Sequence, residues 1–338
     1  MKTYYITGIS GFLGRNIVNE ILKEKDNYII GLVFPNEKNL DVLKQISNIS
    51  LVEGNILDEK SIDGFLSIPS KGEKIIIHAA GKISVYKKGD PLTTKINYEG
   101  TKIVVDSALR NGCDKFVYVS SVDSLNKSKG DTPIYEQDYY EIDKVDGVYS
   151  KSKVLANNYV LDAVINRGLK ATIVLPSVMI GPSDPFNSPI NLAFKKFLNG
   201  KLGILVKGKY NISDVRDVAK GILLASKKGN IGESYLLTGV QLPILDLINK
   251  VAKYDNRKPI KMTVPVFLVK LVAPFIELHA KLHKKNPLFT GFSMDCLRQN
   301  SNYQNDKAVK ELGFAITNID QTIADTVDWM KSSGYLKK

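Results

Sequence analysis

A tyrosine and a lysine lie four residues apart in the stretch GVYSKSK, residues 147–153, with Ser150 between them. On a helix, Tyr149 and Lys153 would share one face, so the phenol and the ammonium group could form an acid/base pair. Tyrosine and lysine also occur together on ordinary solvated helix faces. The stretch alone therefore leaves both interpretations open, and other parts of the chain must decide between them.

Three glycines at three-residue spacing form a second chemical feature. The stretch TGISGFLGRNIV, residues 7–18, contains Gly8, Gly11 and Gly14 between a strand-like and a helix-like run. Glycine permits a tight turn at a strand end, close approach of a pyrophosphate to the backbone, and close packing of helix on strand, while the helix N-terminus attracts phosphate. In this context the motif predicts a loop that binds a dinucleotide.

The elements that must position these residues alternate in type along the first two thirds of the chain. Short runs of nearly continuous apolar residues are separated by helical stretches, which is typical of a parallel sheet covered on both faces by crossover helices. We therefore expect an α/β fold with a doubly wound parallel sheet of the Rossmann type. The expected strands are residues 4–8, 28–34, 50–54, 74–80, 115–121, 171–176 and 233–239.

The alternation breaks after Pro176, where GPSDPFNSP is rich in proline and glycine. A helix is expected at 213–226 and a mostly helical C-terminal third follows. This predicts a nucleotide-binding domain made of residues 1–176 and 213–238. A smaller, mostly helical substrate domain, residues 177–212 and 239–338, would lie against the carboxyl ends of the strands.

Composition narrows the class of protein. The 338 residues are 43% hydrophobic and 24% charged, which is ordinary for a globular protein. The net charge of +12 comes from scattered lysines, without the clustered basic stripe or module that a nucleic-acid partner would need. Cys113 and Cys296 lie far apart, so neither a disulfide framework nor a metal site is expected.

The expected location is the cytoplasm, because residues 1–8 show no signal-peptide pattern. The most apolar later segment, 262–280, contains charged residues and two prolines and fails as a membrane span. We expect it to close a pocket or pack on the core rather than to contact a membrane surface.

Several further segments resemble the extended branch of the short-chain dehydrogenase/reductase superfamily. The glycine loop resembles its TGxxGxxG motif, and YSKSK carries its Y-x-x-x-K motif. In the same order as in that family follow segments resembling its other motifs: HAAG (78–81), NYEGT (97–101), YVSS (118–121), LPSVMIGP (175–182) and DVRDVA (214–219). The resemblance covers about residues 1–240 with strong motifs.

This resemblance implies three catalytic residues: Ser121, Tyr149 and Lys153. Tyr149 would exchange a proton with a substrate oxygen, to which Ser121 would also hydrogen-bond. Lys153 and a positively charged nicotinamide would lower the pKa of the phenol, and Lys153 would also hold the nicotinamide ribose. His78 is expected to be structural.

The resemblance also implies a set of cofactor-binding residues, which share positions at strand ends and in the glycine loop. They are Gly8, Ser10, Gly11, Phe12, Leu13, Gly14, Phe34, Asn55, Ile56, Ala79, Ala80, Gly81, Asn97, Tyr149, Lys153, Pro176 and Val178.

The chain departs from the family's pattern after the second expected strand. Members that use NAD usually have an acid there for the ribose 2′-hydroxyl, and members that use NADP often have an arginine; here the position is Phe34. Arg15 and Lys38 are cations that could reach a 2′-phosphate. We therefore expect NADP(H) to be favoured slightly over NAD(H).

The motifs around the expected substrate are closest to those of dihydroflavonol-reductase-like and 3β-hydroxysteroid-dehydrogenase-like members. An oxidoreductase acting on a carbonyl or secondary alcohol of a small, apolar substrate is therefore the first expectation. A nucleotide-sugar epimerase or dehydratase with the same Tyr/Lys chemistry is the alternative, and a non-catalytic NAD(P)-binding sensor is a third. A homodimer would fit the family.

Overall fold

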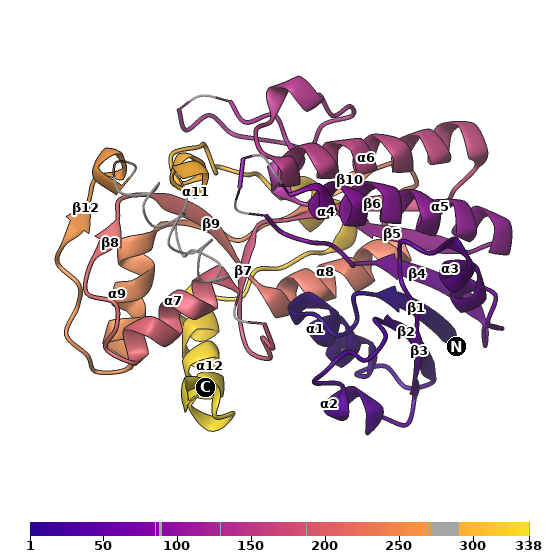
Figure 1. The fold of residues 1–338 in the computed structure, drawn as a ribbon, viewed down its shortest axis with the longest axis horizontal. Helices are drawn as coiled ribbons and strands as arrows, with labels where there is room; N and C mark the ends of the chain where they lie inside the picture. The colour runs from indigo at the N-terminus through magenta and orange to yellow at the C-terminus, as the bar shows by residue number, and fades with distance from the viewer. Residues whose placement is uncertain are drawn as a thin grey trace.

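The structure is a computed structural model that describes residues 1–337, except residues 85, 88, 89, 129, 187, 270 and 272–290. A layered α/β part forms one side of the molecule and a smaller part, rich in C-terminal residues, forms the other (Figure 1). The apolar segment at 262–280 falls mostly outside the described residues, so its expected packing is not addressed. Within the described residues, no helix is long and apolar enough to cross a membrane.

A seven-stranded parallel sheet is the centre of the larger part. Its order is β10-β6-β5-β4-β1-β2-β3, and every pairing in it is parallel. The sequence prediction of a doubly wound parallel sheet is therefore confirmed. The strands are β1 (Lys2–Thr7), β2 (Asn27–Val33), β3 (Ile49–Glu53), β4 (Glu73–His78), β5 (Lys115–Val119), β6 (Ala171–Pro176) and β10 (Ser234–Leu237).

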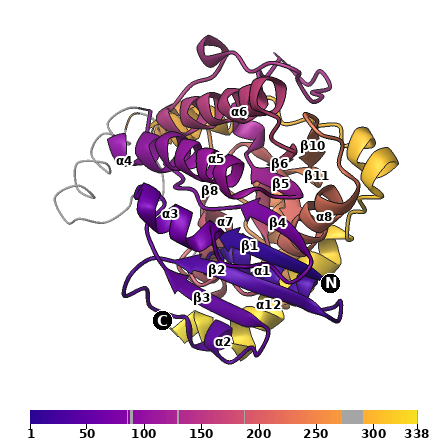
Figure 2. The same cartoon turned by 90° about the vertical axis from the view of Figure 1, so that its right-hand side faces the viewer.

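Two apolar layers cover the sheet because successive side chains of a strand point to opposite faces. Tyr4 and Ile6 of β1 pack in the layer beneath α1 and α8, whereas Tyr5 packs in the layer beneath α3, α5 and α6. Figure 2 shows these two groups of helices on opposite faces of the sheet. The helices are α1 (Phe12–Ile21), α3 (Glu59–Leu66), α5 (Gly100–Asn111), α6 (Val148–Arg167) and α8 (Val215–Lys228), with short α2 (Asp41–Lys44) and α4 (Pro91–Thr94) in the connections.

The strand order reverses direction at β1. From β1 the chain builds outward through β2 and β3 on one side, and through β4, β5, β6 and β10 on the other. In open α/β sheets such a switch point leaves a crevice at the carboxyl ends of the two central strands. The loops after β1 and β4, which carry Gly8 and Ala79, therefore border this crevice.

The smaller part contains strands as well as helices. A three-stranded sheet of order β11-β9-β7 and a two-stranded sheet of β12 and β8 accompany its helices. These five strands were not predicted from the sequence; they are short and all lie after Pro176. They are β7 (Val178–Ile180), β8 (Leu205–Val206), β9 (Lys209–Asp214), β11 (Val240–Pro243) and β12 (Thr263–Val264); the helices are α7 (Pro189–Leu198), α9 (Ile244–Tyr254), α11 (Gly291–Cys296) and α12 (Ile319–Ser332).

The start of α1 packs against β1 without room for a side chain. A Cβ atom at Gly14 would lie 2.1 Å from the carbonyl oxygen of Gly8 and 2.7 Å from the backbone of Ile9. Gly8 has φ +75°, and a Cβ there would meet the backbone of Ala79 and Ala80 at 2.8–2.9 Å. The glycines thus hold the first helix and the ends of β1 and β4 in backbone contact.

We expect Gly14→Ala to destabilise the protein by about 1–3 kcal/mol or more, because its methyl group would overlap backbone atoms that cannot rotate away. Gly64→Ala in α3 is the matched control, since a Cβ there meets nothing within 4 Å. Alanine favours a helix over glycine by about 1 kcal/mol, so the control should be neutral or stabilising. Urea unfolding of both variants measures the difference, and equal stabilities would contradict the backbone contact described above.

Candidate active site

The N-terminus of α1 opens towards the crevice between β1 and β4. Gly11 caps the helix with its backbone only, no side chain hydrogen-bonds the cap, and the first turn carries no acidic residue. The first N–H groups of a helix lack partners inside the helix and carry partial positive charge. The glycine loop, which also contains Ser10, Phe12 and Leu13, thus presents uncapped N–H groups and suits the pyrophosphate of a dinucleotide.

Lys153 lies buried at the same carboxyl edge of the sheet, although α6 covers the opposite face from α1. Its ammonium donates to the carbonyl oxygen of Val119 at 2.9 Å and lies 3.4 Å from the hydroxyl of Tyr118, both on β5. The same nitrogen would be 3.5 Å from a Cβ at Gly81, just after β4. Burial lowers the pKa of this ammonium from 10.5 to about 7, so the chain alone leaves it poised to lose its proton near neutral pH.

Tyr149 and Ser121 meet at the start of α6. Ser121 follows β5 and accepts the backbone N–H of Asp123 on its hydroxyl oxygen at 3.1 Å, and its side chain lies near enough to the Tyr149 phenol to lower the pKa of that group. Gly147 begins α6 at φ +89°, where Phe292 of α11 packs so closely that no side chain would fit. The turn into α6 and the end of β5 thus bring the two hydroxyl groups together.

The pKa of the Tyr149 phenol is raised in the chain itself. Burial is the largest cause, the negative charge of Asp123 adds to it, and the nearby Ser121 side chain opposes it. The sequence analysis expected a lowered pKa from Lys153 and the nicotinamide charge. In the chain alone the shift of this pKa is upward, because burial and the negative charge of Asp123, whose neighbourhood was not foreseen, both raise it.

His78 and Asn97 are structural supports on the crevice side. The two ring nitrogens of His78 lie 2.7 Å and 3.0 Å from the hydroxyls of Thr7 and Thr101. Burial and the Lys153 charge lower the pKa of this imidazole to about 3, which keeps it neutral. Asn97 is fully buried and bonds both backbone groups of Lys82 and the hydroxyl of Ser152.

Asn97 belongs to a π-helical turn, Lys95–Glu99, which joins α4 to α5. Such turns are rare and are frequent at functional sites. The turn directs the Asn97 amide towards Gly81, whose Cβ position is 3.3 Å from the amide oxygen. Asn97 therefore fixes the loop that would line the nicotinamide side of the crevice.

The remaining expected cofactor residues occupy three places. Ala79 and Ala80 follow β4 and face Gly8. Ile56 packs against Gly100, while Asn55 caps its own loop by accepting the N–H of Leu57. Pro176 ends β6 and Val178 begins β7.

The region after β2 holds an acid that the sequence analysis did not consider. Phe34 is 59% exposed, and its N–H donates to the carboxylate of Glu37 at 3.0 Å. The guanidinium of Arg15 donates hydrogen bonds to the backbone carbonyls of Ser10 and Asn39. Burial lowers the pKa of this guanidinium and the nearby Glu37 charge opposes that shift, so Arg15 is less free to meet a phosphate than the sequence suggested.

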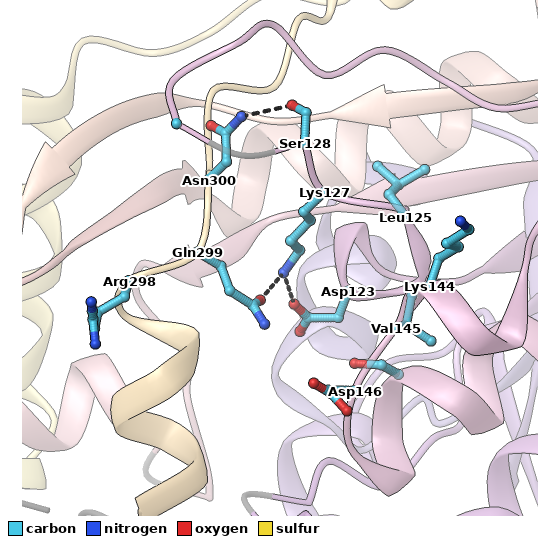
Figure 3. Close-up of a pocket in the computed structure, with 12 residues that line it drawn as sticks. Asp123, Leu125, Lys127, Ser128, Lys144, Val145, Asp146, Arg298, Gln299 and Asn300 are labelled. Carbon is cyan, nitrogen blue, oxygen red and sulfur yellow. Dashed lines mark hydrogen bonds and ion pairs between the residues drawn. The ribbon is translucent and has the colours of Figure 1, made fainter.

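A pocket of about 290 Å³ lies beside Tyr149, on the side of the smaller part. Figure 3 shows it between the segment after Ser121 and the end of α11. Its lining is mostly polar: Asp123, Leu125, Lys127, Ser128, Gly130, Lys144, Val145, Asp146, Ser150, Arg298, Gln299 and Asn300. The lining does not include Ser121, Tyr149 or Lys153, and it differs from the apolar pocket that the sequence analysis expected.

A model of the NAD-dependent epimerase/dehydratase family matches residues 4–237 of this chain. The chain belongs to this family. The match spans the whole central sheet, from β1 to β10. Members of the family are NAD-dependent enzymes, so a nicotinamide cofactor is expected for this one.

Relatives named as a reductase, a sterol demethylase protein and a dehydrogenase/isomerase match half or more of the chain. A Synechocystis protein named "Putative dihydroflavonol 4-reductase" is 29% identical over 99% of this chain and 96% of its own length. Sterol demethylase protein B of Methylococcus capsulatus is 24% identical over 99% and 100%. A monkeypox virus 3 beta-hydroxysteroid dehydrogenase/Delta 5-->4-isomerase is 29% identical over 50% and 49%.

Solved structures share the fold over nearly the full length. The protein gox2253 superposes with a TM-score of 0.83 and 29% identity, covering 98% of both chains. DesIV, a dTDP-glucose 4,6-dehydratase of Streptomyces venezuelae with NAD and TYD bound, gives a TM-score of 0.78 at 20% identity and covers 98% of both chains.

Sequence reasoning missed the polar side of the site. Lys127, Gln299 and the contacts of Asp123 appear only when the segment after β5 meets the chain after α11. Asp123 carried a weak signal, since it lies two residues after Ser121, but nothing in the sequence indicated its partners.

Burial of Lys153 predicts a pH dependence of stability. The folded pKa of about 7 lies below the ordinary value of 10.5, so the unfolded chain binds more protons between these two pH values. The contribution of Lys153 to the free energy of unfolding should therefore increase as the pH rises from 7 to 10. Urea unfolding of the cofactor-free protein at several pH values should show this increase, and Lys153→Met should reduce it.

Lys151→Met is the control, because Lys151 is an exposed lysine on the same helix. It should follow the wild-type curve. If Lys153→Met followed that curve as well, the lowered pKa of Lys153 would be refuted.

Proposed function

We propose that this chain is an NAD(P)-dependent oxidoreductase that transfers hydride between nicotinamide and the carbon of a carbonyl or secondary alcohol. The observation that carries this proposal is that Ser121 lies near enough to Tyr149 to act on the pKa of its phenol, with the buried ammonium of Lys153 one helical turn further on. A proton donor and an oxygen-binding hydroxyl are what reduction of a carbonyl needs.

The chain's own residues divide the work as follows. In the direction of reduction, Ser121 donates a hydrogen bond to the substrate oxygen and Tyr149 gives it a proton; the reverse reaction returns the proton to Tyr149. The bound nicotinamide supplies or accepts the hydride and brings a positive charge in its oxidised form. Lys153 lies on the crevice side of Tyr149. Its positive charge would lower the pKa of the phenol, against the effect of Asp123.

The glycine loop and the ends of β1, β4 and β6 would hold the dinucleotide. We infer a modest preference for NADP(H), supported by the absence of an acid at Phe34 and by the cations Arg15 and Lys38. Glu37 works against this preference, because its carboxylate lies next to Arg15. The discrimination is therefore expected to be worth no more than one charge-assisted hydrogen bond, about 1.5–3 kcal/mol.

A nucleotide-sugar epimerase or dehydratase is the second candidate, favoured by the polar lining of the pocket beside Tyr149. Such an enzyme would regenerate its cofactor in each cycle and hold it tightly. Extraction and chromatography of nucleotides from the purified protein separate the two candidates: stoichiometric retained NAD supports the second, and a requirement for added NAD(P)H supports the first.

We expect Tyr149→Phe to lower turnover by at least about 100-fold, because the phenol is the general acid. Cofactor affinity, measured by fluorescence titration with NADPH, should change little. Tyr139→Phe is the matched control, since Tyr139 is 69% exposed, and it should keep wild-type activity. Turnover of Tyr149→Phe within a few-fold of wild type would exclude this role.

The cofactor preference is tested by kcat/KM for NADPH and NADH. Wild type should favour NADPH, Phe34→Asp should move the ratio towards NADH by repelling a 2′-phosphate, and Glu37→Gln should move it further towards NADPH. Asp41→Asn, at an exposed acid in α2, is the charge-matched control. An NADH preference in the wild type would overturn the inference.

A further inference from the structure

The largely buried side chain of Lys127 organises a polar cluster on the pocket side of Tyr149. Its ammonium donates to Asp123 Oδ1 at 2.7 Å and to Gln299 Oε1 at 2.9 Å, and Tyr303 lies nearby. Figure 3 shows the two bonds to Asp123 and Gln299, which reach the nitrogen from the segment after β5 and the segment after α11. An ammonium group has three N–H donors, and two of those of Lys127 are committed to Asp123 and Gln299.

These two bonds fix the groups that face the pocket. Because Lys127 can only donate, the Gln299 amide must turn its oxygen to the lysine and leave its NH₂ group on the other side. One carboxylate oxygen of Asp123, Oδ1, accepts the hydrogen bond from Lys127. Among the described residues, Asp123 Oδ2 and the Gln299 NH₂ group have no recorded hydrogen-bond partner, and both residues line the pocket.

The chemistry of these two groups selects a class of ligand. Asp123 offers an acceptor and Gln299 a donor, both held by one lysine, and a hydroxyl group can satisfy both at once. A carboxylate or phosphate at this position would face the charge of Asp123. The positive charge of Lys127 does not change this, because it is already paired with that carboxylate.

The cluster is directly connected to the reacting groups. The N–H of Asp123 donates to Ser121, and the charge of Asp123 acts on Tyr149. The side chains that surround the ion pair also include Tyr210 of β9 and Cys296 of α11. Asp123 is therefore the member of the cluster that would meet a substrate held by Ser121 and Tyr149.

We propose that Asp123 and Gln299 bind a hydroxyl group on the carbon next to the reacting carbonyl, so that the substrate is a hydroxy-carbonyl compound or the corresponding diol. This inference rests on the proposed hydride transfer. Lys127 is a positioning residue that orients both groups without touching the substrate.

Three small ketones test the proposal with NADPH or NADH: hydroxyacetone, methoxyacetone and 2-butanone. Methoxyacetone keeps an acceptor oxygen but has no hydroxyl proton, and 2-butanone has neither. For wild type we expect kcat/KM to be about 10- to 100-fold higher with hydroxyacetone than with either analogue, which is the loss typical of a hydrogen bond to a charged group.

Asp123→Asn reverses the polarity at the pocket. Its amide oxygen must take the Lys127 bond, which leaves an NH₂ group where the free carboxylate oxygen was. The preference for hydroxyacetone over methoxyacetone should fall at least tenfold.

Gln299→Leu is the second variant. It should lower kcat/KM for hydroxyacetone while leaving kcat/KM for 2-butanone within a few-fold of wild type. Asp146→Asn is the matched control, since Asp146 lines the same pocket but is exposed and pairs with Lys87; it should keep the wild-type preference.

The outcomes are distinct. If wild type reduces all three ketones equally well, or if both variants keep the full preference, the hydroxyl site is refuted while the oxidoreductase stands. An equal loss with all three ketones in Asp123→Asn would assign Asp123 to the chemical step and also refute the site. If wild type consumes no reduced cofactor with any of the three, the proposed function fails and the inference fails with it.

Discussion

The buried ammonium group of Lys153 is the constraint on which the arrangement of the site depends. Burying an unpaired cation is costly, and its pKa falls to about 7 in response. The carbonyl of Val119, the hydroxyl of Tyr118 and the loop at Gly81 surround it. This places the first turns of α6, and with them Tyr149, at the carboxyl ends of β4 and β5.

Two opposite electrostatic environments result on the two sides of Tyr149. On the crevice side lie a buried lysine, a neutral histidine and an uncapped helix N-terminus, all suited to an electron-rich dinucleotide. On the pocket side lies Asp123 with its counter-ion Lys127. The raised pKa of the phenol keeps Tyr149 protonated in the chain alone, which is the state needed to donate a proton to a carbonyl.

The sequence predicted the sheet well because buried parallel strands are nearly continuous in apolar residues. All seven strands of the central sheet, from β1 to β10, fall within a few residues of their expected places. The glycine loop was readable for a related reason, since its three glycines lie close together in the chain and Gly14 is fixed by local backbone contacts with Gly8 and Ile9. Such features depend on residues close in the chain or on patterns with a fixed period.

Other features could not be read in this way. The bond between Lys127 and Gln299 joins residues 172 positions apart, and no local pattern encodes a contact of that kind. The strands of the smaller part are two to six residues long, and the longest of them, β9, is KYNISD, which lacks a continuous apolar run. Glu37 was overlooked because the acid was sought at the end of β2, whereas the turn after Phe34 brings it back three residues later.

The central claim is net hydride transfer: the substrate is released from the enzyme in its reduced form. Isotope transfer tests this claim most directly. The protein would be incubated with a carbonyl substrate and NAD(P)H deuterated at the transferable C4 position, and the products analysed by mass spectrometry. The account predicts one deuterium on the former carbonyl carbon of the alcohol for each cofactor oxidised. Released product without label, together with nicotinamide retained and unchanged on the protein, would contradict it.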